Sequence, residues 1–118
     1  MNPAEIYDEY AINFPGVWPT FRDGWVYVHD GQVAKVDIIA GLLSRHIAAG
    51  QVIVLVHSTP GIGAILPKER AADFIASHVR DGDIQAADPS FTSFVEVSTV
   101  GVATGWTENA GKPDGRVT

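Results

Sequence analysis

The sequence has no cysteine, little basic charge and no long apolar run, and each absence excludes a class of function. Without cysteine the chain forms no disulfide, thiolate metal site or cysteine nucleophile. Its eight Lys and Arg residues are scattered, and its net charge of −6 disfavours nucleic acid and anionic membrane surfaces as partners. The longest apolar run, Val52–Val56, is far shorter than the roughly 20 residues that span a bilayer. With no secretory pattern at the N-terminus, we expect a cytoplasmic protein.

The composition indicates one folded domain. The chain has 118 residues, of which 46% are apolar and 19% charged, so it can bury a hydrophobic core without disulfides or structural metals. We expect the domain to span residues 1–106. Residues 107–118 are polar and rich in glycine and proline, which predicts a flexible C-terminal tail.

Hydrophobic periodicity and turn residues predict an α+β fold. The expected order is a short helix capped by Asn2, a hairpin of 25–29 with 32–36, a helix from the N-cap Asp37 to Ala49, a strand Val52–Val56, a helix from Pro67 to before Gly82 and a long strand Ser90–Ala103. Segment 58–66 is either a strand-to-helix loop or a return strand after a turn at Pro60-Gly61. We expect a mixed sheet of four to five strands with two main helices packed on one face, a two-layer sandwich.

Segment 57–63 carries the residue types of a small catalytic or ligand site. His57 is a candidate general base, and Ser58 and Thr59 are candidate donors or nucleophiles at the end of the central strand. The candidate ligand-binding residues are Gly61, Gly63 and Lys68. Two glycines before a helix favour an anion or small ligand, although both phosphate-loop fingerprints are missing.

The stretch His57-Ser58-Thr59-Pro60-Gly61 resembles the HGTPG segment of α/β-hydrolases, whose loop amides face an oxyanion. The resemblance is confined to this stretch, and Ser58 stands where the first glycine belongs. The chain lacks a G-x-S-x-G nucleophile elbow and is too short for that fold, so it is assigned to no family. The four histidines lie 17, 11 and 21 residues apart, so we expect no metal and no cofactor.

An aromatic loop and acidic turns favour a different function. Trp18 and Phe21 lie among prolines and are candidate interface anchors, with Asp81, Asp83 and Asp88 as a charged rim. The leading hypothesis is therefore an acidic protein-interaction module that binds a basic protein, as inhibitors, immunity proteins and phage or mobile-element accessory proteins do. The alternative is a small enzyme or ligand-binding domain at 57–63. A homo-oligomer paired through the edge of Ser90–Ala103 is a third hypothesis.

Overall fold

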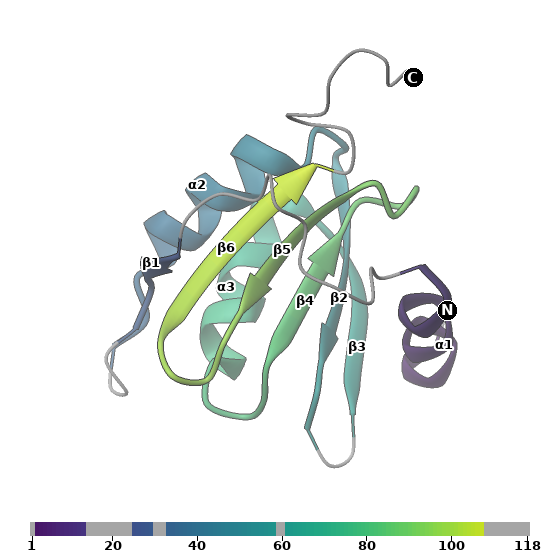
Figure 1. The fold of residues 1–118 in the computed structure, drawn as a ribbon, viewed down its shortest axis with the longest axis horizontal. Coiled ribbons are helices and arrows are strands. Elements are labelled where there is room, and N and C mark those ends of the chain that lie inside the picture. Colours follow the sequence, from purple (N-terminus) through teal and green to yellow (C-terminus); the bar gives the residue numbers. More distant parts are fainter. Residues whose placement is uncertain (1, 14–24, 30–32, 59–60, 108–118) are drawn as a thin grey trace.

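A computed structural model of the chain describes residues 2–13, 25–29, 33–58 and 61–107. These residues form three helices and six strands (Figure 1). The helices are α1 (Pro3–Asn13), α2 (Val36–His46) and α3 (Lys68–His78). The strands are β1 (Val26–Tyr27), β2 (Gln51–Val56), β3 (Ile62–Pro67), β4 (Ile84–Ala87), β5 (Ser93–Val97) and β6 (Val102–Thr107).

The six strands form one antiparallel sheet in the order β1-β6-β5-β4-β2-β3. The α+β class is confirmed, but the prediction of a mixed sheet with four to five strands is wrong. Segment 58–66 contains the return strand of a hairpin, in which Val56 pairs with Ile62 and Gln51 with Pro67. Because the chain reverses before α3, the strand after α3 runs antiparallel to β2 and pairs with its other side.

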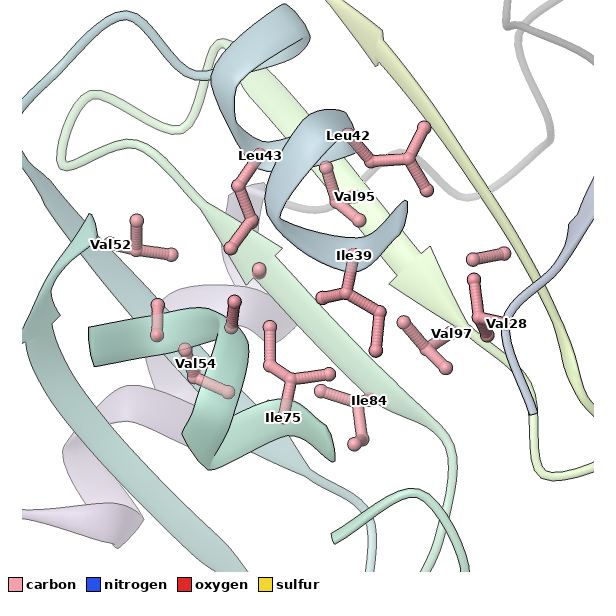
Figure 2. Packing of buried hydrophobic residues seen from close by; sticks show 14 of the residues in the cluster. Val28, Ile39, Leu42, Leu43, Val52, Val54, Ile75, Ile84, Val95 and Val97 are labelled. Carbon is pink, nitrogen blue, oxygen red and sulfur yellow. The ribbon is translucent and has the colours of Figure 1, made fainter. Parts of the chain in front are cut away.

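The central strand β2 is buried on both faces, as its continuous apolar run predicts. On one face Val52, Val54 and Val56 join a core with residues of α2 and α3 (Figure 2). On the other face Ile53 and Leu55 pack with residues of α1 and with Phe94 and Trp106. The two main helices, α2 and α3, therefore pack on one face of the sheet as expected, and α1 packs on the other face.

The segment expected as one long strand, Ser90–Ala103, is a hairpin. β5 and β6 are joined by a turn in which the Gly101 amide donates to the Ser98 carbonyl at 3.0 Å. β5 lies between β4 and β6, so it offers no edge to a second copy.

Two further expectations differ in detail. α2 begins at Val36 and ends at His46, so Asp37 lies in its first turn, where a carboxylate suits the helix dipole, and is not the N-cap. The hairpin of 25–29 with 32–36 is reduced in its described part to one bridge, His29 with Ala34. Thr107, expected as the first residue of the tail, is instead the last residue of β6, and the remainder of the expected tail lies outside the described residues and stays a prediction.

Candidate functional site

A pocket of about 580 Å³ lies between α1 and the end of the β2–β3 hairpin. Its described lining residues are Ala4, Tyr7 and Asp8 of α1, Leu55 and Val56 of β2, and His57, Ser58 and Gly61 of the hairpin loop. We call it the His57 pocket. His57 directly follows β2, so the strand fixes its backbone while its side chain reaches the face that carries α1.

α1 is fixed at both ends, which gives the pocket a stable wall. At its start the Asn2 amide donates to the Glu5 carboxylate at 2.8 Å, and the Glu5 amide donates to Asn2 Oδ1 at 2.9 Å. This reciprocal pair is a capping box, and it confirms Asn2 as the cap. Further along, the buried Tyr10 hydroxyl donates to the Ile53 carbonyl of β2 at 2.6 Å. Burial, with a smaller contribution from the charge of Asp88, raises the pKa of Tyr10 well above its ordinary value.

His57 is held in place by contacts from two sides. Its Nε2 lies 3.0 Å from Gln85 Oε1, and because an amide oxygen only accepts, Nε2 is the donor. Its ring meets the Tyr7 ring edge to face, with centroids 6.2 Å apart. In the neutral ring, Nδ1 is then the acceptor nitrogen.

The loop amides of 57 and 58 are used inside the fold. The His57 amide donates to the Asp83 carbonyl at 2.8 Å, and the Ser58 amide donates to the Val56 carbonyl at 2.9 Å. Neither is left to stabilise an oxyanion in the manner that the hydrolase-like segment suggests. Thr59, the other candidate donor, lies outside the described residues.

A polar row continues from His57 across the sheet. Gln85 is paired with Glu96, and Glu96 is paired with Thr104, so their side chains share the face that carries α1. The Oε1 atom of Glu96 is buried and has no hydrogen-bond partner. Burial, and to a lesser extent the negative charge of Asp83, raises the pKa of Glu96 to about 7. The alternation of Val95, Glu96 and Val97 separates the two faces, but it does not reveal that the second face is covered.

Glu96 makes the stability of the fold depend on pH. The unfolded chain releases this proton near pH 4.5, whereas the folded chain holds it to about pH 7. The tighter hold of the folded chain on the Glu96 proton therefore contributes fully to the free energy of unfolding below pH 4.5, and this contribution is lost as the pH rises through 7. We expect Glu96→Gln to be more stable than the wild type at pH 8, with a smaller difference at pH 5, in urea unfolding. The exposed Glu69→Gln is the matched control, and an equal difference at both pH values would contradict the assignment.

The candidate anion-binding residues do not come together. Gly61 lines the His57 pocket, and Gly63 lies within β3. Lys68 follows the far end of β3, where its Nζ donates to the Ile47 carbonyl at 2.6 Å. The glycines thus serve a hairpin and do not form a phosphate cradle in front of α3.

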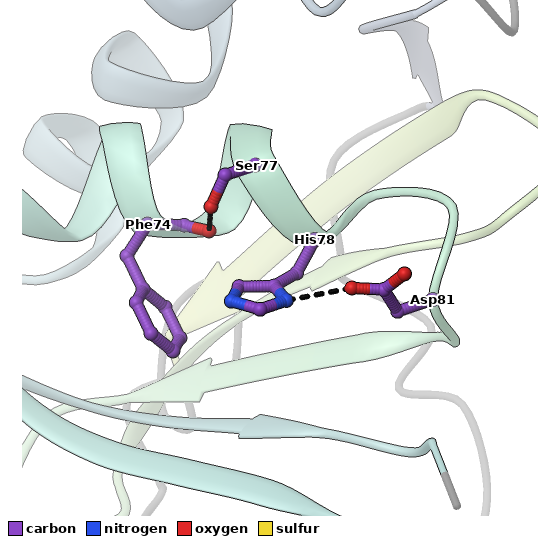
Figure 3. Close-up of polar contacts among 4 residues, drawn as sticks. All are labelled: Phe74, Ser77, His78 and Asp81. Carbon is purple, nitrogen blue, oxygen red and sulfur yellow. Dashed lines mark hydrogen bonds and ion pairs between the residues drawn. The ribbon is translucent and has the colours of Figure 1, made fainter.

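The three aspartates expected to form a charged rim are divided between the two ends of β4. Near its start, Asp81 accepts from His78 Nδ1 at 2.7 Å, and the His78 ring lies against the Phe74 ring (Figure 3). Asp83, in the same region, accepts from the Thr99 amide at 3.0 Å. Beyond its other end, Asp88 accepts from the Thr92 amide at 2.7 Å. Each carboxylate therefore has a local structural partner. Trp18 and Phe21 lie outside the described residues, so partner binding through these five residues stays a prediction.

Comparison of the chain with models of protein families, with curated proteins and with solved structures found no match. In the described part of the chain, no group of three or more His, Asp or Glu side chains is placed to hold a metal ion. None of the described helices is both long and apolar enough to cross a membrane.

Proposed function

We propose that the chain binds a small organic ligand in the His57 pocket. The observation that carries the proposal is the pocket itself, a hollow of about 580 Å³ on the face of a central buried strand, with the His57 ring at its wall. Cavities of this size that combine apolar walls with a few placed polar groups are typical ligand sites. The His57 and Tyr7 rings supply hydrogen-bonding atoms beside the apolar side chains of Ala4 and Leu55.

The lining favours a neutral or positively charged ligand with an aromatic or aliphatic body. Among the described lining residues, Asp8 is the only one with a carboxylate, and none is a Lys or Arg. The net charge of −6 adds a field that repels anions from the whole surface. Flat apolar rings suit the space between Tyr7 and Leu55, and an ammonium group suits Asp8.

A charge-matched pair of probes tests this proposal. Tryptamine and indole-3-acetate have the same ring system and opposite charge, and binding is followed by the amide and ring NMR signals of Tyr7, His57 and Ser58. We expect tryptamine to shift these signals saturably and indole-3-acetate to bind more weakly. No saturable shift with either probe, or with neutral indole, would contradict a site for this class of ligand.

A pair of helix variants locates the binding. Ala4 and Ala11 are both exposed positions of α1, but only Ala4 lines the pocket. Ala4→Phe should fill the pocket and weaken tryptamine binding by about tenfold, which corresponds to about 1.4 kcal/mol. Ala11→Phe adds the same side chain elsewhere and should leave binding unchanged. Equal effects of the two variants would place the probe outside the His57 pocket.

A second candidate function, the acidic protein-interaction module, is favoured by exposed apolar residues at the β1 edge of the sheet. Tyr27 is 72% exposed and Val100 is 78% exposed, and Trp25, Val26 and Val33 are also exposed. Tyr27 pairs with Val102 and the Val28 amide donates to the Gly101 carbonyl at 2.8 Å, so this edge lies beside the β5–β6 turn that carries Val100. Apolar clusters of this kind mark interaction surfaces.

The interaction hypothesis predicts a partner whose binding depends on both the apolar edge and opposite charge. A basic protein retained by the wild type in a pull-down from native cells should be lost with Tyr27→Ser or Trp18→Ala and should bind more slowly at high salt. Ile12→Ser, an equally exposed position on α1, is the control. Retention that ignores salt and both aromatic substitutions would refute this second function.

A further inference from the structure

β3 is the outermost strand of the sheet, and no described strand pairs with its outer side. Its six residues, Ile62 to Pro67, include no charged side chain. In natural proteins, charges, prolines, bulges or very short length usually prevent an edge strand from pairing with another chain. β3 has a proline only at its last position, and Ile65 in its middle is 40% exposed.

The ladder with β2 shows which backbone groups of β3 point outward. The Lys68 amide donates to the Gly50 carbonyl at 2.8 Å, so these two residues form a hydrogen-bonded pair at the end of the ladder. Hydrogen-bonded and non-hydrogen-bonded pairs alternate along antiparallel strands. The residues of β3 that bond to β2 are therefore Leu66, Ala64 and Ile62. The N–H and C=O groups of Gly63 and Ile65 point away from β2, toward the side on which no described strand pairs.

The opposite side of β2 supports the same assignment. The His57 amide donates to the Asp83 carbonyl of the strand beyond, so odd-numbered residues of β2 bond to β4. Even-numbered residues of β2 are left to bond to β3, in agreement with the assignment at Lys68.

We infer that the outer edge of β3 pairs antiparallel with β3 of a second copy, joining the two sheets across a two-fold axis at Ala64. In this register Gly63 faces Ile65 of the partner subunit, and each such pair exchanges two hydrogen bonds. Ala64 meets its own copy across a close non-hydrogen-bonded pair, where its small side chain fits. An antiparallel edge is complementary to itself, as a two-fold interface requires.

Charge and area define the kind of dimer. β3 itself is uncharged, whereas each copy carries a net charge of −6, so the copies repel at long range and added salt should strengthen the dimer. Pairing along one short strand buries less than about 1,200 Å², which is typical of weak or transient complexes. The dimer should therefore form at micromolar concentrations and dissociate on dilution. This salt response is opposite to that expected for a basic protein partner.

Two substitutions at Ile65 test the edge. Ile65→Pro removes an outward N–H while leaving the bonds to β2 intact, as prolines at sheet edges do. Ile65→Lys places a charge on the edge and keeps every backbone group. Val100→Lys adds the same charge at the exposed β5–β6 turn and is the control. Sedimentation velocity measures the dimer over a dilution series, and circular dichroism checks the fold of each variant.

We expect the wild type and Val100→Lys to dimerise alike, and both Ile65 variants to raise the dimer dissociation constant by about tenfold or more. In the wild type, the amides of Gly63 and Ile65 should exchange hydrogen more slowly as the protein concentration rises, a readout that needs no variant. A wild type that stays monomeric to millimolar concentration, or a dimer that neither Ile65 substitution weakens, would overturn the inference.

Discussion

Replacing Tyr10 with alanine is expected to lower the free energy of unfolding by about 3–5 kcal/mol, the usual loss for a large buried aromatic. Tyr10 is 3% exposed and packs edge to face on Phe91, with ring centroids 5.1 Å apart. Its hydroxyl also bonds to the Ile53 carbonyl. Because this side chain fixes α1 to the sheet, its loss should also open the wall of the His57 pocket and abolish tryptamine binding.

Tyr10→Phe separates the ring from the hydroxyl. It keeps the apolar contact and removes one hydrogen bond, so it should cost about 0.5–1.5 kcal/mol. Urea unfolding measures both variants, and NMR titration measures probe binding in conditions where each remains folded. If Tyr10→Ala cost no more than Tyr10→Phe, the ring would not be what holds α1.

The contact between Tyr10 and Phe91 requires a strained backbone in the loop that carries Phe91. Phe91 has a φ of 56°, a left-handed conformation that costs a non-glycine residue about 1–2 kcal/mol. The loop is held by Asp88, whose carbonyl accepts from the Phe91 amide at 2.9 Å and whose carboxylate accepts from the Thr92 amide and hydroxyl. Packing of the Phe91 ring against Tyr10 offsets the strain.

Sequence patterns succeeded where one local signal was sufficient. The run Val52–Val56 predicts a strand buried on both faces, and both core clusters contain its side chains. The spacing of five apolar residues predicts one buried helical face, namely Ile38, Ile39, Leu42, Leu43 and Ile47. Four of them are buried, and Ile38 is 37% exposed. For Pro60-Gly61 the pattern left a loop and a hairpin equally open, and pairing of β3 with β2 decides for the hairpin.

The remaining features depend on contacts distant in the sequence. The His57 pocket exists because α1 lies over β2, and a helix pattern does not state which face of a sheet the helix will cover. Glu96 is placed beside Gln85 by the register of β5 on β4, which its own alternation does not fix. The β5–β6 turn lacks an Asn-Gly or Asp-Gly signal. The alternation of apolar and polar residues on either side of the turn therefore predicts a single strand.

Gly101→Ala is the second substitution for which a large effect is expected. Gly101 has a φ of 108°, which side chains rarely adopt, and its carbonyl accepts from the Val28 amide at 2.8 Å. A Cβ added there would collide with the His29 carbonyl oxygen, so β1 would have to move away from β6. We expect a loss of about 2–4 kcal/mol in urea unfolding, the sum of backbone strain and of the displaced contact.

Gly50→Ala separates this cause from a general effect of losing glycine. An added Cβ at Gly50 meets nothing within 4 Å, so that variant should change stability by less than about 0.5 kcal/mol. Because β1 carries exposed Val26 and Tyr27, Gly101→Ala should also disturb the apolar edge. The His57 pocket lies at the opposite end of the sheet, beside β2 and β3, and should still bind tryptamine. Equal stability of the two alanine variants would show that the β5–β6 turn does not depend on the left-handed backbone at Gly101.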